Sequence, residues 1–397
     1  MPWRNMSRMD EKIQFINEWR SGAWTTRALC AAFGISHTLG YKYIHRWEEG
    51  GVVGLEELSR APRNVANKTP ARIEEAIVKL RKQHRRWGAE KLLTILAEQF
   101  PEEQWPAVST GNLILKRNGL VVARRHVRRI KPLHPIFDPH SPNEVWSADF
   151  KGKFRMGNGR YCHPLTIADS FSRYLFAAKG MHHPTYEGSK PVFEAVFREY
   201  GLPEQLHTDN GGPFGSAQGL ARLTRLSVWF IELGIEPVYS DPAHPEQNGR
   251  HERMHRELKA EATRPPAYSL SPQQRRLNSF LREYNELRPH QALGNNTPAR
   301  VHVRSAREYP HKITEWVYPK HMVVRYVSRN AAIRWKSYYW VMVSSCLAEK
   351  HVGLEELGNG IWRVFFRQKL LGYLDEKTLR IEDEQGRQRR GRSGNKV

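Results

Sequence analysis

The spacing of hydrophobic residues changes along the chain, and each change predicts a different kind of structure. Between residues 9 and 117 apolar side chains recur every three or four positions, as in Ile73, Ile77 and Leu80, which predicts amphipathic helices. Between residues 145 and 181 apolar and polar residues alternate, which predicts strands. Helical and strand-like runs then alternate, and short strand-like runs separated by glycines begin at residue 322. The pattern predicts three parts in order: all-α, α/β and all-β.

The first helical part, residues 1–58, has the pattern of a helix-turn-helix domain. Thr25 or Thr26 can cap a second helix, Gly34 allows a tight turn, and Ser36 can cap a third helix. In such a domain the third helix contacts DNA. The exposed residues of this helix that we expect to bind DNA are Tyr41, Lys42 and Arg46.

A second helical part, residues 70–130, resembles a helix-turn-helix domain less closely and runs into a basic segment. Residues 116–131 contain seven Lys and Arg and no acidic residue. A run of like charges is usually a solvated segment, but its place directly after a candidate recognition helix favours contact with DNA phosphates. The arginines predicted to make this contact are Arg124, Arg125, Arg128 and Arg129.

The composition supports a polyanionic partner. The chain has 63 Lys and Arg against 41 Asp and Glu, a formal charge of +22, and nucleic acid is the common partner of such proteins. The alternative for the charge is a basic ribosome-associated or membrane-surface protein. The alternative for the first helices is an ordinary three-helix packing unit. The three cysteines are far apart and form no CxxC pair, which argues against a zinc finger or a disulfide framework. We expect no membrane segment, because no run of about 18 apolar residues occurs.

The C-terminal part, residues 315–381, is predicted to be a small all-β barrel that binds DNA. Its short alternating runs are separated by glycines, and basic residues accompany aromatic ones near Tyr338 and Trp340. Residues 382–397 are predicted to be a disordered basic tail.

The central part, residues 143–300, contains three acidic residues at positions suited to metal binding. Asp149 lies in the first predicted strand, and Asp209 ends the fourth and precedes Asn-Gly-Gly. Glu252 lies on a helix, where Arg256 and Lys259 share its face. A divalent ion that acts on phosphodiesters needs hard oxygen ligands on rigid elements. If the first and fourth strands are neighbours, Asp149 and Asp209 lie side by side.

Four motifs occur in order in this part: WSADF at 146–150, HTDNGG at 207–212, residues 245–259, and YNELRPHQAL at 284–293, followed by Thr297-Pro298. Together, and following predicted N-terminal DNA-binding domains, these motifs resemble the integrase core of insertion-sequence transposases and retroviral integrases. The resemblance covers about residues 143–300. It implies an RNase H-like fold and an Asp-Asp-Glu site, matched here by Asp149, Asp209 and Glu252. Such a site would bind two Mg²⁺ (or Mn²⁺) ions.

The third acidic residue has an alternative. The interval between Asp209 and Glu252 is longer than is common in such cores, and Glu246 would shorten it by six residues. We prefer Glu252, because the motif match continues through Gly249 to Leu258-Lys259, whereas Glu246 follows a proline in a loop.

The resemblance also implies a function. The protein would be a DNA transposase that binds the terminal inverted repeats of its element, frees 3′-OH ends and joins them to target DNA. Its partner would be double-stranded DNA, on which it would act as a dimer or tetramer, in the cytoplasm and at the nucleoid. The alternatives are a non-catalytic DNA-binding regulator or inactive transposase remnant, and a nuclease that hydrolyses RNA–DNA hybrids.

Overall fold

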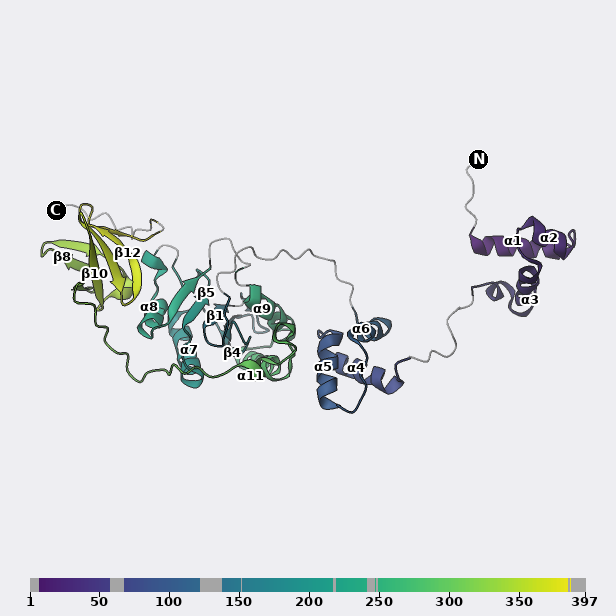
Figure 1. The fold of residues 1–397 in the computed structure, drawn as a ribbon, viewed down its shortest axis with the longest axis horizontal. Helices are drawn as coiled ribbons and strands as arrows, with labels where there is room; N and C mark the ends of the chain where they lie inside the picture. Colours follow the sequence, from purple (N-terminus) through teal and green to yellow (C-terminus); the bar gives the residue numbers. More distant parts are fainter. Residues whose placement is uncertain are drawn as a thin grey trace. The chain divides into compact units, whose positions relative to one another are not determined.

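The computed structural model describes residues 7–57, 68–121, 138–150, 152–216, 219–240, 247, 249–384 and 386 (Figure 1). The chain forms two compact units, Met1–Pro70 and Ala71–Val397. Several residues of the predictions lie outside the described ranges, namely Glu246, the basic tail from residue 387, and Arg124, Arg125, Arg128 and Arg129. No helix in the described ranges is long and apolar enough to cross a membrane.

The first unit consists of α1 (Arg8–Arg20), α2 (Thr26–Ala32) and α3 (His37–Gly54). The side chains of Thr25 and Ser36 cap α2 and α3 by accepting hydrogen bonds from backbone amides. The two helices approach closely at Gly40, where an added Cβ would lie 2.3 Å from the Cys30 sulfur. Tyr41 and Lys42 are exposed on α3. Arg46 is only half-buried and donates to the backbone carbonyl of Glu56, so it also holds the end of the unit.

The second unit begins with three helices, α4 (Ala71–Gln83), α5 (Ala89–Gln99) and α6 (Val108–Arg117). Their apolar stripes meet in one core, in which Ile77 and Leu92 have no exposed surface and Trp87 is 1% exposed. These helices are therefore a folded part of the second unit, as the hydrophobic spacing predicts.

The central sheet contains β1 (Val145–Phe150), β2 (Phe154–Arg155), β3 (Tyr161–Asp169), β4 (Leu175–Met181), β5 (Gln205–Thr208) and β6 (Glu236–Tyr239). The order is β2-β3-β1-β5-β6, with β4 also paired to β3. β3 is antiparallel to β1 and β4, whereas β1, β5 and β6 are mutually parallel. The first and fourth predicted strands correspond to β1 and β5, which are neighbours in the sheet. This sheet is that of the predicted RNase H-like core.

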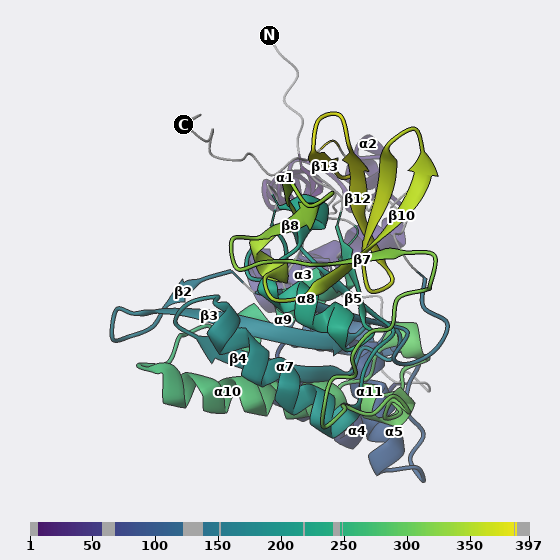
Figure 2. The ribbon, with the colours of Figure 1, turned by 90° about the vertical axis from the view of Figure 1, so that its left-hand side faces the viewer.

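Helices cover both faces of the sheet (Figure 2). On one face, α7 (Tyr186–Tyr200) and α8 (Arg225–Glu232) pack against Trp146 and other buried aromatic residues. On the other, α9 (Gly249–Glu261) and α10 (Leu270–Arg282) pack against Leu175. The short element η1 (Leu220–Arg222) precedes α8. Three short elements follow α10: η3 (Glu283–Leu287), η4 (Gln291–Leu293) and α11 (Pro298–Val301).

The C-terminal part is all-β, as predicted. It consists of β7 (Val323–Tyr326), β8 (Ala332–Trp335), β9 (Tyr339–Met342), η5 (Ser345–Leu347), β10 (His351–Gly358), β11 (Ile361–Phe366), β12 (Lys369–Asp375) and β13 (Arg380–Glu382). Five strands form an antiparallel sheet in the order β13-β12-β11-β10-β7, and β8 and β9 form a hairpin. In the described residues no ladder joins β13 to β7, so the sheet is open where we predicted a closed barrel. Alternation of hydrophobic residues predicts strands, but closure depends on which strands pair.

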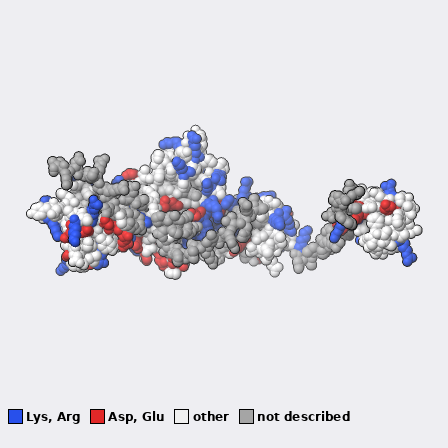
Figure 3. All heavy atoms as spheres, turned by 90° about the horizontal axis from the view of Figure 1, so that it is seen from above, with Lys and Arg blue, Asp and Glu red and all other residues white. Residues whose placement is uncertain are grey.

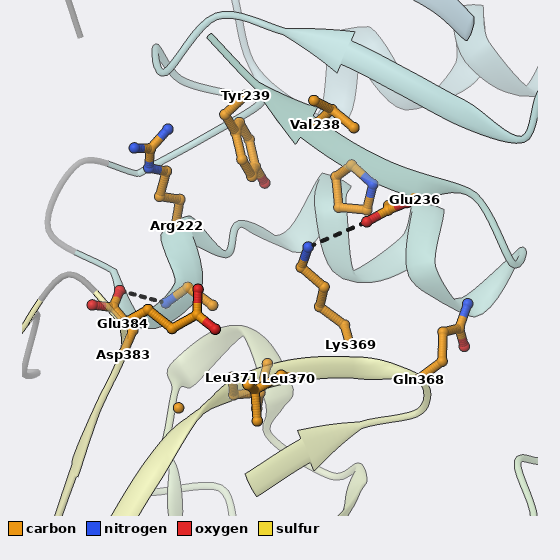
Figure 4. A pocket seen from close by; sticks show the side chains of 13 residues that line it. Arg222, Glu236, Val238, Tyr239, Gln368, Lys369, Leu370, Leu371, Asp383 and Glu384 are labelled. Atoms are coloured by element: carbon orange, nitrogen blue, oxygen red, sulfur yellow. Dashed lines mark hydrogen bonds and ion pairs between the residues drawn. The ribbon is translucent and has the colours of Figure 1, made fainter. Parts of the chain in front are cut away.

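The C-terminal sheet shares a core with the central part. Val228 and Ile231 of α8 belong to the same buried cluster as Leu354 and Val364 of the sheet. A pocket of about 470 Å³ lies between β6 on one side and β12 with Asp383 and Glu384 on the other (Figure 4). Lys369 reaches across it to Glu236, at 3.6 Å. The two domains therefore pack directly on each other.

Candidate catalytic site

Alternation along β1 directs Asp149 toward α9. Trp146 and Ala148 belong to the core beneath α7 and α8, so Ser147 and Asp149 face the opposite side of the sheet. There the Ser147 hydroxyl lies 2.8 Å from Nδ1 of His251, and Oδ2 of Asp149 lies 3.5 Å from Nδ1 of His255. The side chain of Asp149 is 19% exposed. The strand thus presents a carboxylate that is largely buried yet reachable from solvent.

The Thr166 hydroxyl on β3 joins this face to α9. It donates to the backbone carbonyl of Asp149 at 3.0 Å, and it lies 2.7 and 2.6 Å from Nε2 of His251 and His255. The same hydroxyl thus contacts both imidazole rings of α9. The network anchors α9 to β1 and β3 and fixes the backbone at Asp149.

The end of β5 places Asp209 beside Asp149. The parallel pairing of β1 and β5 ends at Ala148 and Thr208, so the two aspartates are the next residues on neighbouring strands. The Gly211 amide donates to Oδ1 of Asp209 at 3.1 Å. A Cβ at Gly211 would lie 3.0 Å from the Asp209 carboxylate, so a side chain there would crowd this carboxylate. Burial raises the pKa of Asp209, although the Gly211 amide lowers it.

The turn after Asp209 is held by Arg222. Its guanidinium donates to Oδ1 of Asn210 at 2.7 Å and to the Ser240 carbonyl at 3.3 Å, and Asn210 donates to the same carbonyl at 2.7 Å. Arg222 is 8% exposed. This arrangement ties the Asp209 turn to the end of β6, so the carboxylate is on a rigid support.

Glu252 lies on the exposed face of α9. Arg256 and Lys259 are exposed on the same face, whereas His251, Met254, His255 and Leu258 are buried. Within the described ranges, no three His, Cys, Asp or Glu side chains are grouped closely enough to hold a metal ion. The structure therefore brings Asp149 and Asp209 to adjacent strand ends and places Glu252 on the helix anchored beside them, but it does not gather all three carboxylates.

The carboxylate groups of the two adjacent aspartates are suitable ligands for a divalent metal ion. Carboxylate oxygens are the hard ligands that Mg²⁺ and Mn²⁺ prefer, and both side chains lie on supported backbone at one end of the sheet. The pKa of Asp209 is raised, and perturbed pKa values are common at functional sites.

Sequence reasoning missed two features that shape this site. The spacing of His251 and His255 could have indicated one shared helix face, because residues four apart lie together. Their contact with Thr166, and the contact of Arg222 with Asn210, depend on which strands and loops meet. Arg288, which follows η3, is buried and paired with Glu257 and Glu261 at 2.8 and 3.2 Å.

Comparison with known proteins identifies the domains. Residues 139–245 and 233–298 each match an integrase core domain family. Residues 11–63 match a helix-turn-helix domain family, and residues 39–115 match a homeodomain-like domain family. The class that the fold and these matches define is a protein with helix-turn-helix domains in front of an integrase-type core.

Similar proteins come from insertion elements. An uncharacterized 39.2 kDa protein of insertion element IS476 from Xanthomonas euvesicatoria is 27% identical over 62% of this chain and 69% of that protein. An uncharacterized 31.7 kDa protein of IS407 from Burkholderia multivorans is 24% identical over 56% of this chain and 78% of that protein. The catalytic core of HTLV-2 integrase, solved with magnesium, is 18% identical with a TM-score of 0.34, over 42% of this chain and all of that one. The two integrase core matches and the similarity to insertion-element proteins confirm the predicted resemblance to an integrase-type core.

Proposed function

We propose that this protein cleaves DNA at the ends of its element and joins the freed 3′-OH ends to target DNA. The observation that carries the proposal is the position of Asp149 and Asp209 at neighbouring ends of parallel strands, beside the helix that bears Glu252. The integrase core match over residues 139–298 supports the reaction class.

In the proposed reaction, the oxygen of water attacks a phosphodiester at the element end, and the bond to the 3′ oxygen breaks to leave a 3′-OH. This hydroxyl then attacks a target phosphodiester, so one P–O bond forms as another breaks. Asp149, Asp209 and Glu252 would hold divalent metal ions, which activate the nucleophile and stabilise the leaving oxygen when bound. The network of Thr166 with His251 and His255 holds β1 and α9 in register for this site.

Other parts of the chain would bind the DNA. Tyr41 and Lys42 are exposed on α3 and would contact the terminal repeats, with Arg46. Arg256 and Lys259 would contact backbone phosphates beside Glu252. Joining two ends in one event requires at least two active sites, so we propose a dimer or tetramer assembled on DNA at the nucleoid.

A strand-transfer assay tests the proposal. Duplexes carrying the DNA that flanks the gene, with a free 3′-OH, are incubated with plasmid and Mg²⁺ or Mn²⁺. We expect joined products from the wild type, lost in EDTA, and a loss of roughly 10³-fold for Glu252→Gln, since metal ligation contributes several kcal/mol to such reactions. Glu286→Gln, which alters an exposed glutamate of the same domain, should retain activity.

The outcomes separate the alternatives. Full activity of Glu252→Gln together with a loss for Glu246→Gln would move the third ligand to Glu246. Hydrolysis of RNA–DNA hybrids without joining would support a nuclease. Tight DNA binding without metal-dependent cleavage would support a non-catalytic regulator, which the ungrouped carboxylates of the described structure favour as the second candidate.

A further inference from the structure

A strongly basic pocket lies along the flank of α9. It has a volume of about 270 Å³, and its lining includes six Lys and Arg side chains but one carboxylate, that of Glu257. The cations come from separate elements: Lys91 from α5, Arg173 from the β3–β4 turn, Arg288 from after η3, and Arg250, Arg253 and Arg256 from α9. Lys and Arg side chains also gather on the face of the second unit that Figure 3 shows. Segments distant in sequence therefore bring like charges together at one place.

The acidic residues near the pocket neutralise only part of this charge. Glu257 is shared by Arg288 at 2.8 Å, Arg86 at 3.0 Å and Arg256 at 3.7 Å. Arg250 reaches Asp138 at 3.2 Å. By contrast, Lys91, Arg173 and Arg253 form no ion pair with any described residue, and Arg173 donates to the Ser170 carbonyl at 2.6 Å.

Lys91 and Arg173 have lowered pKa values. Burial and the nearby Arg288 lower the pKa of Lys91 to about 8, although Glu257, Glu261 and Glu90 act to raise it. Burial, with Arg250 and Arg253, lowers the pKa of Arg173 to about 10. A bound anion would oppose both effects, because it favours the charged form of each side chain. In contrast, the pocket of Figure 4 mixes Arg222 and Lys369 with three acidic residues, so its charge does not select an anion.

We propose that the basic pocket binds a phosphate group, and that this phosphate belongs to the backbone of the DNA on which the core acts. The second clause rests on the function proposed above. Arg253 and Arg256 line the pocket and are exposed on α9, and Arg256 also shares the face of Glu252, so cations continue from the pocket to this face. A strand that passes Glu252 can place a phosphate in the pocket, where the guanidinium groups can donate paired hydrogen bonds.

The first experiment uses inorganic phosphate as the probe. The melting temperature of the full chain is measured in phosphate and in chloride at equal ionic strength. The wild type should be stabilised by phosphate, and Lys91→Gln should be stabilised less, because the bound anion loses a charged partner. Lys91→Arg retains the charge and should behave as the wild type. Lys179→Gln removes an exposed lysine on β4 that does not line the pocket, and it should also behave as the wild type.

The second experiment measures affinity for duplex DNA at several salt concentrations. Lys91→Gln should bind about tenfold more weakly at low salt, and the slope of log K against log salt should fall by about one, as expected for the loss of one phosphate contact. Lys91→Arg should restore both values, which a purely structural role of Lys91 would not require.

The outcomes distinguish this inference from the proposed function. Equal phosphate stabilisation of the wild type and Lys91→Gln would overturn the pocket. A phosphate effect with unchanged DNA affinity and slope would overturn the assignment to DNA and point to a free phosphate-containing ligand. Altered DNA affinity in a protein that joins no ends would support the pocket while rejecting the proposed reaction.

Discussion

His290 remains neutral among the cations of the basic pocket. Burial, with Lys91, Arg288 and Arg173, lowers its pKa to about 3, whereas an unperturbed histidine titrates near ~6.5. Among the described residues its Nε2 atom is buried without a hydrogen-bond partner. A proton there would add another positive charge to a site whose lining has six Lys and Arg side chains and one carboxylate.

This environment predicts a pH-dependent stability. Between pH 6.5 and 3 the unfolded chain binds a proton at His290 that the folded protein excludes, so the free energy of unfolding falls as the pH decreases through this window. The slope from one group reaches about 1.4 kcal/mol per pH unit. Urea unfolding should show a shallower pH dependence for His290→Gln than for the wild type. His311→Gln, at an exposed position, is the control, and equal slopes for all three proteins would contradict the prediction.

Asp149 shows how one residue depends on contacts that its own sequence motif does not contain. The motif places a carboxylate in a strand, but its surroundings come from Thr166 on β3 and His255 on α9. Alternation in β1 determines the face on which Asp149 lies. Only the packing of α9 on that face determines that an imidazole is its neighbour.

At the scale of elements, α9 has a packing side and an exposed side. Its buried side packs Met254 and Leu258 against the sheet and α10. Its exposed side carries Glu252, Arg256 and Lys259, of which Arg256 also lines the basic pocket. A period of 3.6 residues separates these sides, so substitutions on each should have different effects.

Two substitutions on α9 test this separation. Leu258 has no exposed surface, so Leu258→Ala should lower the free energy of unfolding by about 2–5 kcal/mol through lost burial and a residual cavity. Arg256→Gln, on the exposed side, should change stability by less than about 0.5 kcal/mol and weaken DNA binding instead. Urea unfolding and DNA titration of both variants provide the measurement. A stable Leu258→Ala protein would show that α9 does not depend on this packing.

For the whole molecule, the basic charge is divided between two compact units, 1–70 and 71–397. The first has its own core, with Phe15, Ile16 and Leu29 at most 1% exposed. The second joins α4–α6, the central sheet and the C-terminal sheet through shared contacts such as Arg86 with Glu257 and Lys350 with Glu232. Recognition of DNA sequence and chemistry on DNA are therefore expected to be separable.

Removal of residues 1–70 tests this separation. The 71–397 fragment should retain the thermal transition of the second unit, because the core of the first unit is not shared with it. It should bind DNA with affinity that depends on salt but no longer on the terminal sequence, since nonspecific binding comes mainly from phosphate contacts. Calorimetry and competition with unrelated DNA measure the two effects. Retained preference for the element ends would place recognition in the second unit.

The sequence alone indicated most of the helices and strands, a cap of α2 at Thr25 or Thr26, a cap of α3 at Ser36, and the resemblance of the core. These properties depend on local spacing and on short motifs, which the order of residues contains. Only the tertiary structure decided that β1 lies beside β5, that Thr166 links both histidines, that the C-terminal sheet is open, and that cations from α5, a turn and α9 form one pocket. Each of these joins residues distant along the chain, and such contacts depend on how all elements pack together.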